Sequence, residues 1–206
     1  MTDSAAVYIV DDNLQLLEAL QQLFSTVGIA SRAFGSAQEF LDHWSPGFRG
    51  CLLVDMRMPG ISGIDLQARL KKRRIHLPVI FMSGHNNVQS AVHVMKNGAL
   101  EVLQKPFDHD QLIDEVNKAL ALEEAQFRSL QKQNQYTRLI DTLTEREREV
   151  MEEMVAGATN KEIGKTLNLS PRTVETHRAH VVQKLGVKSV AELVEMAAFL
   201  RRQSEE

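Results

Sequence analysis

Reactive polar side chains stand at or just beyond the ends of apolar segments that have the length of buried β-strands. These segments are rich in Val, Ile and Leu, as buried parallel strands are. The pairs are Val7–Val10 with Asp11 and Asp12, Cys51–Val54 with Asp55, Pro78–Met82 with Ser83, and Leu100–Leu103 with Lys105. Because the carboxyl ends of parallel strands meet at one edge of a sheet, we expect these side chains to converge there.

This combination of groups is suited to phosphoryl transfer. Asp55 closes the predicted central strand, so we expect it to be the reactive carboxylate. Carboxylates held close together repel one another unless they share a cation, and their oxygens suit Mg²⁺. Lys105 would add a positive charge and Ser83 a hydroxyl donor for phosphoryl oxygens. Such a site promotes in-line transfer by positioning the groups and neutralising charge.

Each of these residues has an ordinary structural explanation when it is taken alone. Asp11-Asp12 is a common helix start, Ser83-Gly84 a common loop and Lys105-Pro106 a common turn. Only their joint occurrence, each at the end of its own strand, makes the functional interpretation specific.

Strand and helix patterns alternate five times between residues 1 and 122. After each strand segment, apolar residues recur every three or four positions, and Gly28 and Gly98 mark two helix ends. Right-handed crossovers would put helices on both faces of the sheet. The predicted fold class is therefore α/β, a five-stranded doubly wound parallel sheet of the flavodoxin type, in a domain of residues 1–122.

Residues 123–141 form a predicted helical linker that is rich in Gln and charge. Val116, Leu120, Phe127 and Leu130 keep a partial heptad spacing, which Glu123 interrupts. A solvated linker helix and a short dimerising coiled coil both agree with this pattern.

Residues 142–206 are predicted to form a small all-α domain of four helices. Paired residues mark the four helix starts: Thr144 with Glu147, Thr159 with Glu162, Ser170 with Pro171, and Ser189 with Glu192. Gly157 and Gly186 stand where helices are expected to end. Only Asn168-Leu169-Ser170 separates the second helix from the third, which is the short turn of a helix-turn-helix.

Positive charge is concentrated on this predicted helix-turn-helix. Residues 160–188 contain six Lys and Arg but two acidic residues, whereas the whole chain has a net charge of −3. This distribution indicates a DNA-binding surface. Val174, Val181 and Leu185 should pack inward and leave the opposite face of their helix for the major groove. Lys161, Lys184 and Lys188 are predicted to contact phosphates. The stripe that would enter the groove consists of Arg172, Glu175, Thr176, Ala179 and Gln183. His177 and His180 are available as further donors, and Arg178 is also a predicted DNA contact.

The composition is that of a soluble globular protein, with 206 residues of which 43% are hydrophobic and 25% charged. No apolar run approaches the roughly 20 residues that cross a bilayer. The first residues lack the pattern of a signal peptide. The one cysteine, Cys51, cannot form an internal disulfide and lies in an apolar run. We therefore expect a cytoplasmic protein without a membrane partner.

Residues 5–122 resemble the receiver domain of bacterial two-component response regulators. The matching motifs are Val10-Asp11-Asp12, Asp55-Met56-Arg57-Met58-Pro59-Gly60, Met82-Ser83-Gly84-His85 and Lys105-Pro106-Phe107. The resemblance implies that Asp55 accepts a phosphoryl group from a sensor histidine kinase, as a stoichiometric acceptor and not as an enzyme. The implied Mg²⁺ ligands are Asp11, Asp12, Asp55 and the backbone carbonyl of Arg57. Ser83 and Lys105 would bind the phosphoryl group, and the Lys105-Pro106 peptide would be cis.

Residues 142–206 are similar to the LuxR-type helix-turn-helix. The matching segments are Leu143–Glu147, Asn160–Ile163, Ser170–Glu175 and Lys184–Val187. Together the two resemblances imply a regulator of the NarL/FixJ family, nearest to the FixJ branch, that binds double-stranded promoter DNA. RNA polymerase is a further candidate partner. Gly164 stands where the family usually has Ala, which would loosen the second helix slightly.

We expect phosphorylation to promote a homodimer, because one helix-turn-helix reads few base pairs and two copies fit a pseudo-palindrome. The expected dimer face combines three residues of the fourth helix with one of the fifth strand: Val88, Val92, Met95 and Val102. Ser83 and the loop through His85 would connect phosphorylation to this face. The family usually has Tyr or Phe at the position of Val102, so we expect a smaller shift and some dimer before phosphorylation.

Two other functions fit parts of the sequence. A haloacid-dehalogenase-type phosphatase would use Asp55 as nucleophile, but it needs a second acid two residues later, where Arg57 stands. A DNA-binding regulator that keeps a receiver fold without using phosphorylation is the second alternative. Val102 favours it, and the complete set of acids, hydroxyl and lysine argues against it.

Overall fold

The chain folds into two compact units, which we describe separately. A computed structural model describes residues 5–84 and 88–204, with side chains as far as residue 202. The first unit extends to Phe127, and the second begins at Arg128. His85, in the predicted switch loop, lies outside the described residues.

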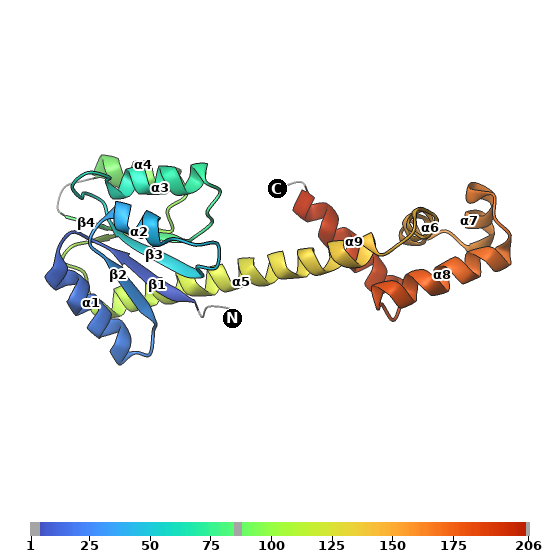
Figure 1. The fold of residues 1–206 in the computed structure, drawn as a ribbon, viewed down its shortest axis with the longest axis horizontal. Helices are drawn as coiled ribbons and strands as arrows, with labels where there is room; N and C mark the ends of the chain where they lie inside the picture. The colour runs from blue at the N-terminus through green and yellow to red at the C-terminus, as the bar shows by residue number, and fades with distance from the viewer. Residues whose placement is uncertain (1–4, 85–87, 205–206) are drawn as a thin grey trace. The chain divides into compact units, whose positions relative to one another are not determined.

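The first unit is a five-stranded parallel sheet between two layers of helices (Figure 1). Its strands lie in the order β2-β1-β3-β4-β5, which makes β3 the central strand and confirms the predicted fold class. The strands are β1 Ala6–Val10, β2 Ser31–Phe34, β3 Gly50–Asp55, β4 Val79–Ser83 and β5 Glu101–Gln104. The helices are α1 Leu14–Thr26, α2 Ala37–His43, α3 Gly63–Lys72, α4 Val88–Lys96 and α5 His109–Asp141.

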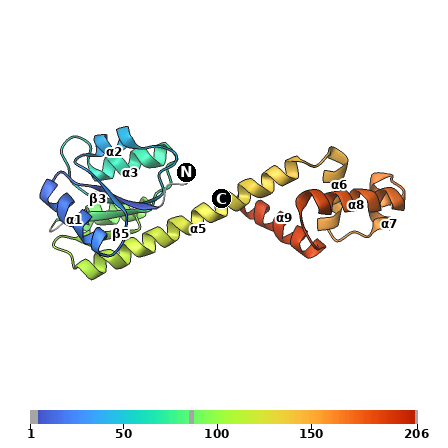
Figure 2. The ribbon, with the colours of Figure 1, turned by 60° about the horizontal axis from the view of Figure 1, so that its bottom comes forward.

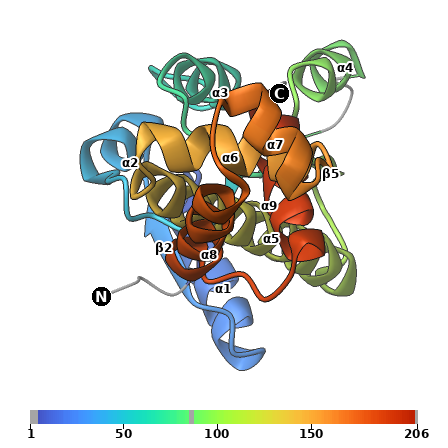
Figure 3. The same ribbon diagram turned by 90° about the vertical axis from the view of Figure 1, so that its right-hand side faces the viewer.

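Alternate residues of each strand face two different cores. In β1, Tyr8 packs in the core beneath α2, α3 and α4, whereas Ile9 packs in the core beneath α1 and α5. Figure 3 shows α3 and α4 on the side of the first unit opposite to α1. Cys51 is buried in the second of these cores. Burial, with a contribution from the charge of Glu123, raises the pKa of its thiol to about 12. The thiol is therefore protonated and unreactive at neutral pH.

Helix α5 is one helix of 33 residues that contains the end of the first unit and the start of the second. The carboxylate of Asp108 accepts two backbone N–H groups of its first turn. Residues 123–141, the predicted linker, are helical as expected. The first unit nevertheless continues beyond residue 122, because Glu123 is buried and Phe127 still contacts this unit.

The second unit packs four helices and the end of α5 around one apolar core (Figure 2). The helices are α6 Glu145–Val155, α7 Asn160–Leu167, α8 Pro171–Leu185 and α9 Val190–Ser204. Thr144 and Thr159 form two of the three expected capping boxes, and Ser170 caps α8. At the start of α9, the hydroxyl of Ser189 accepts the N–H of Glu192 at 3.2 Å as expected. The carboxylate of Glu192 instead accepts the N–H of Lys188, one residue before the expected position. None of the helices in residues 5–84 and 88–204 is long and apolar enough to cross a membrane.

Candidate functional site

The carboxyl edge of the sheet brings Asp11, Asp55 and Lys105 into contact. Nζ of Lys105 lies 2.6 Å from Oδ2 of Asp11 and 2.6 Å from Oδ1 of Asp55. Asp11 is 1% exposed and Asp55 is 9% exposed. Oδ2 of Asp55 accepts the N–H of Arg57 at 2.7 Å, and Oδ1 of Asp11 accepts the N–H of Asn13 at 2.8 Å. All four carboxylate oxygens therefore have partners, as buried charges require.

Lys105 is charged in this environment. Burial by itself would lower the pKa of its ammonium, but the hydrogen bonds and charges of Asp11 and Asp55 outweigh burial and raise the pKa. The backbone also fixes this residue, since its N–H donates to the carbonyl of Ser83 at 2.7 Å. The Lys105-Pro106 peptide is cis, as the receiver resemblance implies.

The backbone of Asp55 is held by close packing on one side and by the neighbouring strand on the other. A Cβ at Gly63, the first residue of α3, would lie 2.2 Å from the carbonyl oxygen of Asp55, so glycine is needed for this approach. On the other side, Asp55 pairs with Met82 of β4. The carboxylate therefore projects from a rigid strand end.

The paired carboxylates fit a divalent cation in their chemistry. Asp11 and Asp55 already converge on one positive group, the Lys105 ammonium, and carboxylate oxygens are the ligands that Mg²⁺ prefers. The side chains of Asp12 and Arg57 are exposed. Within residues 5–84 and 88–202, no three His, Cys, Asp or Glu side chains converge as a ready metal site. A metal would thus take over the neutralisation that Lys105 provides.

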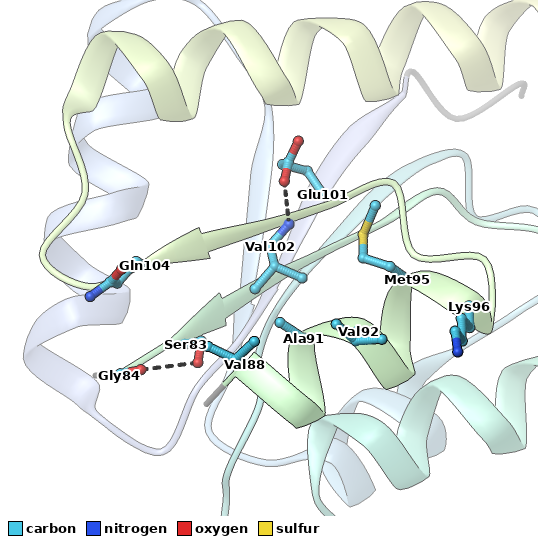
Figure 4. A pocket seen from close by; sticks show the side chains of 10 residues that line it. All are labelled: Ser83, Gly84, Val88, Ala91, Val92, Met95, Lys96, Glu101, Val102 and Gln104. Carbon is cyan, nitrogen blue, oxygen red and sulfur yellow. Dashed lines mark hydrogen bonds between the residues drawn. The ribbon is translucent and has the colours of Figure 1, made fainter. Parts of the chain in front are cut away.

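Ser83 ends β4 and lies beside a cavity between α4 and β5 (Figure 4). The side chain is buried, and its hydroxyl donates to the carbonyl of Gly84 at 3.1 Å. The cavity has a volume of about 540 Å³. Its lining includes all four residues of the predicted dimer face: Val88, Val92, Met95 and Val102. The structure therefore brings the predicted hydroxyl ligand and the predicted dimer face to one surface.

In the second unit, the predicted groove face of α8 is exposed. Val174, Val181 and Leu185 are buried in the core as predicted. The exposed residues include Arg172, Glu175, Thr176 and Ala179 on α8, together with Lys161 and Lys188 on either side of it in sequence. The hydroxyl of Thr176 donates to the carbonyl of Arg172 at 3.1 Å, which leaves its methyl group for apolar contacts.

His177 and Arg178 are less accessible than the rest of this set, because both are half-buried. Nη1 of Arg178 lies 3.5 Å from the carbonyl oxygen of Ala158. Nδ1 of His177 is buried and has no hydrogen-bond partner in the part of the chain that the structure describes. Their contacts with DNA stay predictions.

Lys184 makes an ion pair inside the domain. Its Nζ lies 2.6 Å from Oε2 of Glu147 and 3.3 Å from the carbonyl oxygen of Thr142. The hydrogen bond from Lys184, and then the backbone N–H of Thr144, lower the pKa of the buried Glu147 carboxyl to about 2. Nδ1 of His180 lies 3.5 Å from Oε1 of the same carboxylate. Lys184 thus has a structural role besides the phosphate contact predicted for it.

Gly164 allows a close approach in the turn of the helix-turn-helix. A Cβ at this position would lie 2.8 Å from the carbonyl oxygen of Leu169. The N–H of Leu169 donates to the carbonyl of Gly164 at 2.8 Å. Glycine at this position therefore lets the turn pack tightly against α7, at a cost in helix propensity.

Sequence reasoning missed two charged pairs. Lys184 and Glu147 are 37 residues apart, and Arg49 and Glu123 are 74 residues apart, so no local pattern connects them. The sequence showed Glu147 as a capping residue and Glu123 as an interruption of an apolar repeat. Glu147 begins an amphipathic helix and Glu123 interrupts one. These positions were the only indication in the sequence that the two carboxylates are buried.

Two family models match the chain. The model of the response regulator receiver domain matches residues 7–117. The model described as bacterial regulatory proteins, luxR family, matches residues 141–197. The first range lies within the sheet unit, which contains Asp55, and the second lies within the helical unit, which contains the helix-turn-helix.

Several relatives match over most of the length of the chain. Transcriptional regulatory protein FixJ of Azorhizobium caulinodans is 42% identical over 197 residues, which cover 96% of this chain and 93% of that protein. Transcriptional regulatory protein TdiR of Thauera aromatica is 37% identical over 192 residues, 93% of this chain and 85% of that protein. The solved structure of response regulator StyR has a TM-score of 0.88 at 36% identity and covers 95% of this chain and 99% of that chain.

A receiver domain followed by a LuxR-type DNA-binding domain defines a two-component response regulator, and this is the class of protein that the fold and the family matches give. Within that class, the chain belongs to the NarL/FixJ family.

Proposed function

We propose that this protein is a transcription regulator that becomes active when Asp55 is phosphorylated. The main support is the ammonium of Lys105, which lies 2.6 Å from both Asp11 and Asp55 at the carboxyl end of the central strand. This arrangement places an acceptor carboxylate beside a positive charge that can bind a phosphoryl group. A sensor histidine kinase would supply the phosphoryl group, and promoter DNA would be the target of α8.

The phosphoryl group would move from a phosphohistidine of the kinase to Asp55. A carboxylate oxygen of Asp55 attacks phosphorus, an O–P bond forms, the N–P bond breaks, and the histidine leaves as a neutral imidazole after taking up a proton. Asp11, Asp12, Asp55 and the carbonyl of Arg57 would hold Mg²⁺, which neutralises charge on the phosphoryl group when bound. Lys105 then pairs with phosphoryl oxygens instead of the carboxylates, and the Ser83 hydroxyl donates a hydrogen bond to them.

The consequence for DNA would be dimerisation. A phosphoryl group on Asp55 attracts the hydroxyl of Ser83, which lies beside the cavity between α4 and β5. Moving Ser83 changes the surface that Val88, Val92, Met95 and Val102 form. Two receiver domains associated through that surface would offer two copies of α8 to a pseudo-palindromic site, and two copies are what specific reading requires.

Phosphate incorporation from acetyl phosphate tests the proposal. We expect the wild type to incorporate phosphate in Mg²⁺ and not in EDTA, and Asp55→Asn to incorporate none while keeping the wild-type circular dichroism spectrum. Asp42→Asn, the same substitution at an exposed aspartate of α2, is the matched control and should behave as the wild type. Wild-type incorporation in Asp55→Asn would show that another residue is the acceptor. No incorporation in the folded wild type would favour the phosphorylation-independent regulator.

A further inference from the structure

A charged cluster at the start of the central strand contacts α5. This Arg49 cluster consists of Arg49, Glu123, Glu124 and Phe127, all within the first unit. Nε and Nη2 of Arg49 donate to the two carboxylate oxygens of Glu123 at 3.1 Å and 3.0 Å, and Nη2 also donates to Glu124 at 2.5 Å. The guanidinium carbon lies 3.5 Å from the centre of the Phe127 ring. Two carboxylates and one aromatic face therefore surround a single guanidinium group.

The pair of Arg49 and Glu123 is shielded from water, which makes this contact stronger, whereas the Glu124 side chain is 40% exposed. The side chains of Arg49 and Glu123 are 15% and 8% exposed. A bidentate arginine–carboxylate pair combines geometric specificity with charge, and a desolvated cation over an aromatic ring adds further attraction. The hydrogen bond with Glu123 raises the pKa of Arg49, so the guanidinium group stays charged. Removing one partner would leave an unpaired charge in a poorly solvated place, which is unfavourable.

The backbone beneath the guanidinium is fixed by the sheet. The carbonyl of Arg49 accepts the N–H of Ala6 at 2.9 Å and the hydroxyl of Tyr8 at 3.2 Å. The ring of Tyr8 stacks on the ring of Phe48, the residue before Arg49, with centroids 4.8 Å apart and an interplanar angle of 5°. Arg49 is thus a rigid point on the receiver domain, to which α5 is bound.

The position of the cluster along α5 is what gives it importance. In the described part of the chain, the apolar core of the sheet unit includes residues of α5 from Leu112 to Leu120. The helix continues beyond that core, and Glu123 and Phe127 lie one and two turns further along it. The contacts of Arg49 therefore hold a part of the helix that the apolar core does not reach.

We propose that the Arg49 cluster anchors residues 121–127 of α5 to the receiver domain and so carries the effect of phosphorylation into the linker. An unanchored segment of helix would open or move independently of the receiver. DNA binding would then respond less to the state of Asp55. The weaker response of DNA binding rests on the proposed function, whereas the anchoring of residues 121–127 does not.

Amide hydrogen exchange of the unphosphorylated full-length protein tests the anchoring. We expect Arg49→Met to raise exchange in residues 121–127 by about tenfold or more, while exchange in residues 109–118 stays as in the wild type. Lys118→Met is the matched control, because it removes an ion pair between Lys118 and Glu115 of the same helix. The Lys118 side chain is 66% exposed. This variant should leave residues 121–127 unchanged. Glu123→Gln provides a second variant that keeps the arginine in place and should raise exchange in the same residues by a smaller factor.

Wild-type exchange in residues 121–127 of both folded variants would overturn the proposal. Uniformly raised exchange across the sheet in both variants would also overturn it, because the cluster would then stabilise the whole domain and not the helix segment.

Phosphorylation and DNA binding of the same variants test the coupling. Phosphate incorporation at Asp55 should be normal in Arg49→Met, while the gain in DNA affinity on phosphorylation should fall. A gain equal to that of the wild type would refute the coupling. Failure of the wild type to incorporate phosphate would refute the proposed function and leave the exchange result intact.

Discussion

Nζ of Lys184 in α8 lies 2.6 Å from Oε2 of Glu147, whose side chain is 5% exposed at the start of α6. This ion pair joins the end of α8 to the capping box at the start of α6. The same carboxylate also accepts the backbone N–H of Thr144 at 2.8 Å. The Glu147 side chain thus caps the N-terminus of α6 and also holds α8 through Lys184. Its loss should therefore affect both helices.

Lys184→Met should destabilise the DNA-binding unit, because it leaves the buried carboxylate of Glu147 without its cation. We expect the midpoint of thermal unfolding to fall by roughly 4–8 °C. Circular dichroism of the full-length protein measures this midpoint. Lys165→Met, at an exposed lysine of α7, is the control and should not change it. An unchanged midpoint in Lys184→Met would show that the pair contributes nothing to stability.

The stability of this unit should fall in acid through Glu147. Its pKa is lowered in the folded state from an ordinary 4.5 to about 2, so the unfolded state takes up a proton first as the pH falls. The stabilisation is therefore complete above about pH 4.5 and is lost between about pH 4.5 and pH 2. Wild type and Glu147→Gln should differ in thermal midpoint at pH 6 and become more alike at pH 3. A constant difference across this range would contradict the assignment.

Lys105→Met should separate metal binding from signalling. The ammonium now neutralises Asp11 and Asp55, so its removal should let Mg²⁺ bind at least as tightly as in the wild type, which calorimetry can measure. The gain in DNA affinity on treatment with beryllofluoride should be lost, because the ammonium group that would pair with the phosphoryl group is missing even when Mg²⁺ is bound. Lys71→Met, at an exposed lysine of α3, should behave as the wild type. Full activation of Lys105→Met would exclude the proposed role.

Two substitutions in the second unit should have different effects on DNA binding. Glu175→Ala should relax the base preference at one operator position, at a cost of roughly 1–3 kcal/mol on the operator alone. Lys161→Ala should instead weaken operator and scrambled DNA equally and reduce the slope of log affinity against log salt by about one unit. Binding curves on both DNAs at several salt concentrations distinguish the two. Equal losses on both DNAs for Glu175→Ala would show that Glu175 does not read a base.

Val92→Asp should prevent the activated protein from dimerising, because it puts a charge into an apolar surface. Val88, Val92 and Met95 are 75%, 48% and 43% exposed and lie together on α4, which is the kind of patch that marks an interface. Sedimentation should show mostly monomer with some dimer for the untreated wild type, and dimer after beryllofluoride treatment. Val27→Asp, at a 46% exposed valine after α1, is the control and should still dimerise. A wild type that stays monomeric in both states would disprove the dimer mechanism.

The sequence by itself determined the elements and the edge at which the chemistry lies. Apolar runs of strand length, each ending at Asp11, Asp55 or Ser83, define β1, β3 and β4, because a buried parallel strand has almost no polar residues until it ends. The edge strand β5, which precedes Lys105, contains polar residues and is less clearly marked. Capping pairs at Thr144, Thr159 and Ser170 fixed three helix starts for a similar reason, since the orphan N–H groups of a helix must be satisfied locally. Local rules of this kind act within a few residues and can be read directly.

Only the tertiary structure decided which charged side chains meet. Lys105 joins Asp11 and Asp55, Lys184 joins Glu147, and Arg49 joins Glu123, over separations of 37 to 94 residues. For Lys105 the order of the strands made the meeting predictable, because the parallel strands carry their ends to one edge. For Lys184 and Arg49 no such rule exists. Their pairing depends on how helices pack, and packing is set by the shapes of many side chains together rather than by any short pattern.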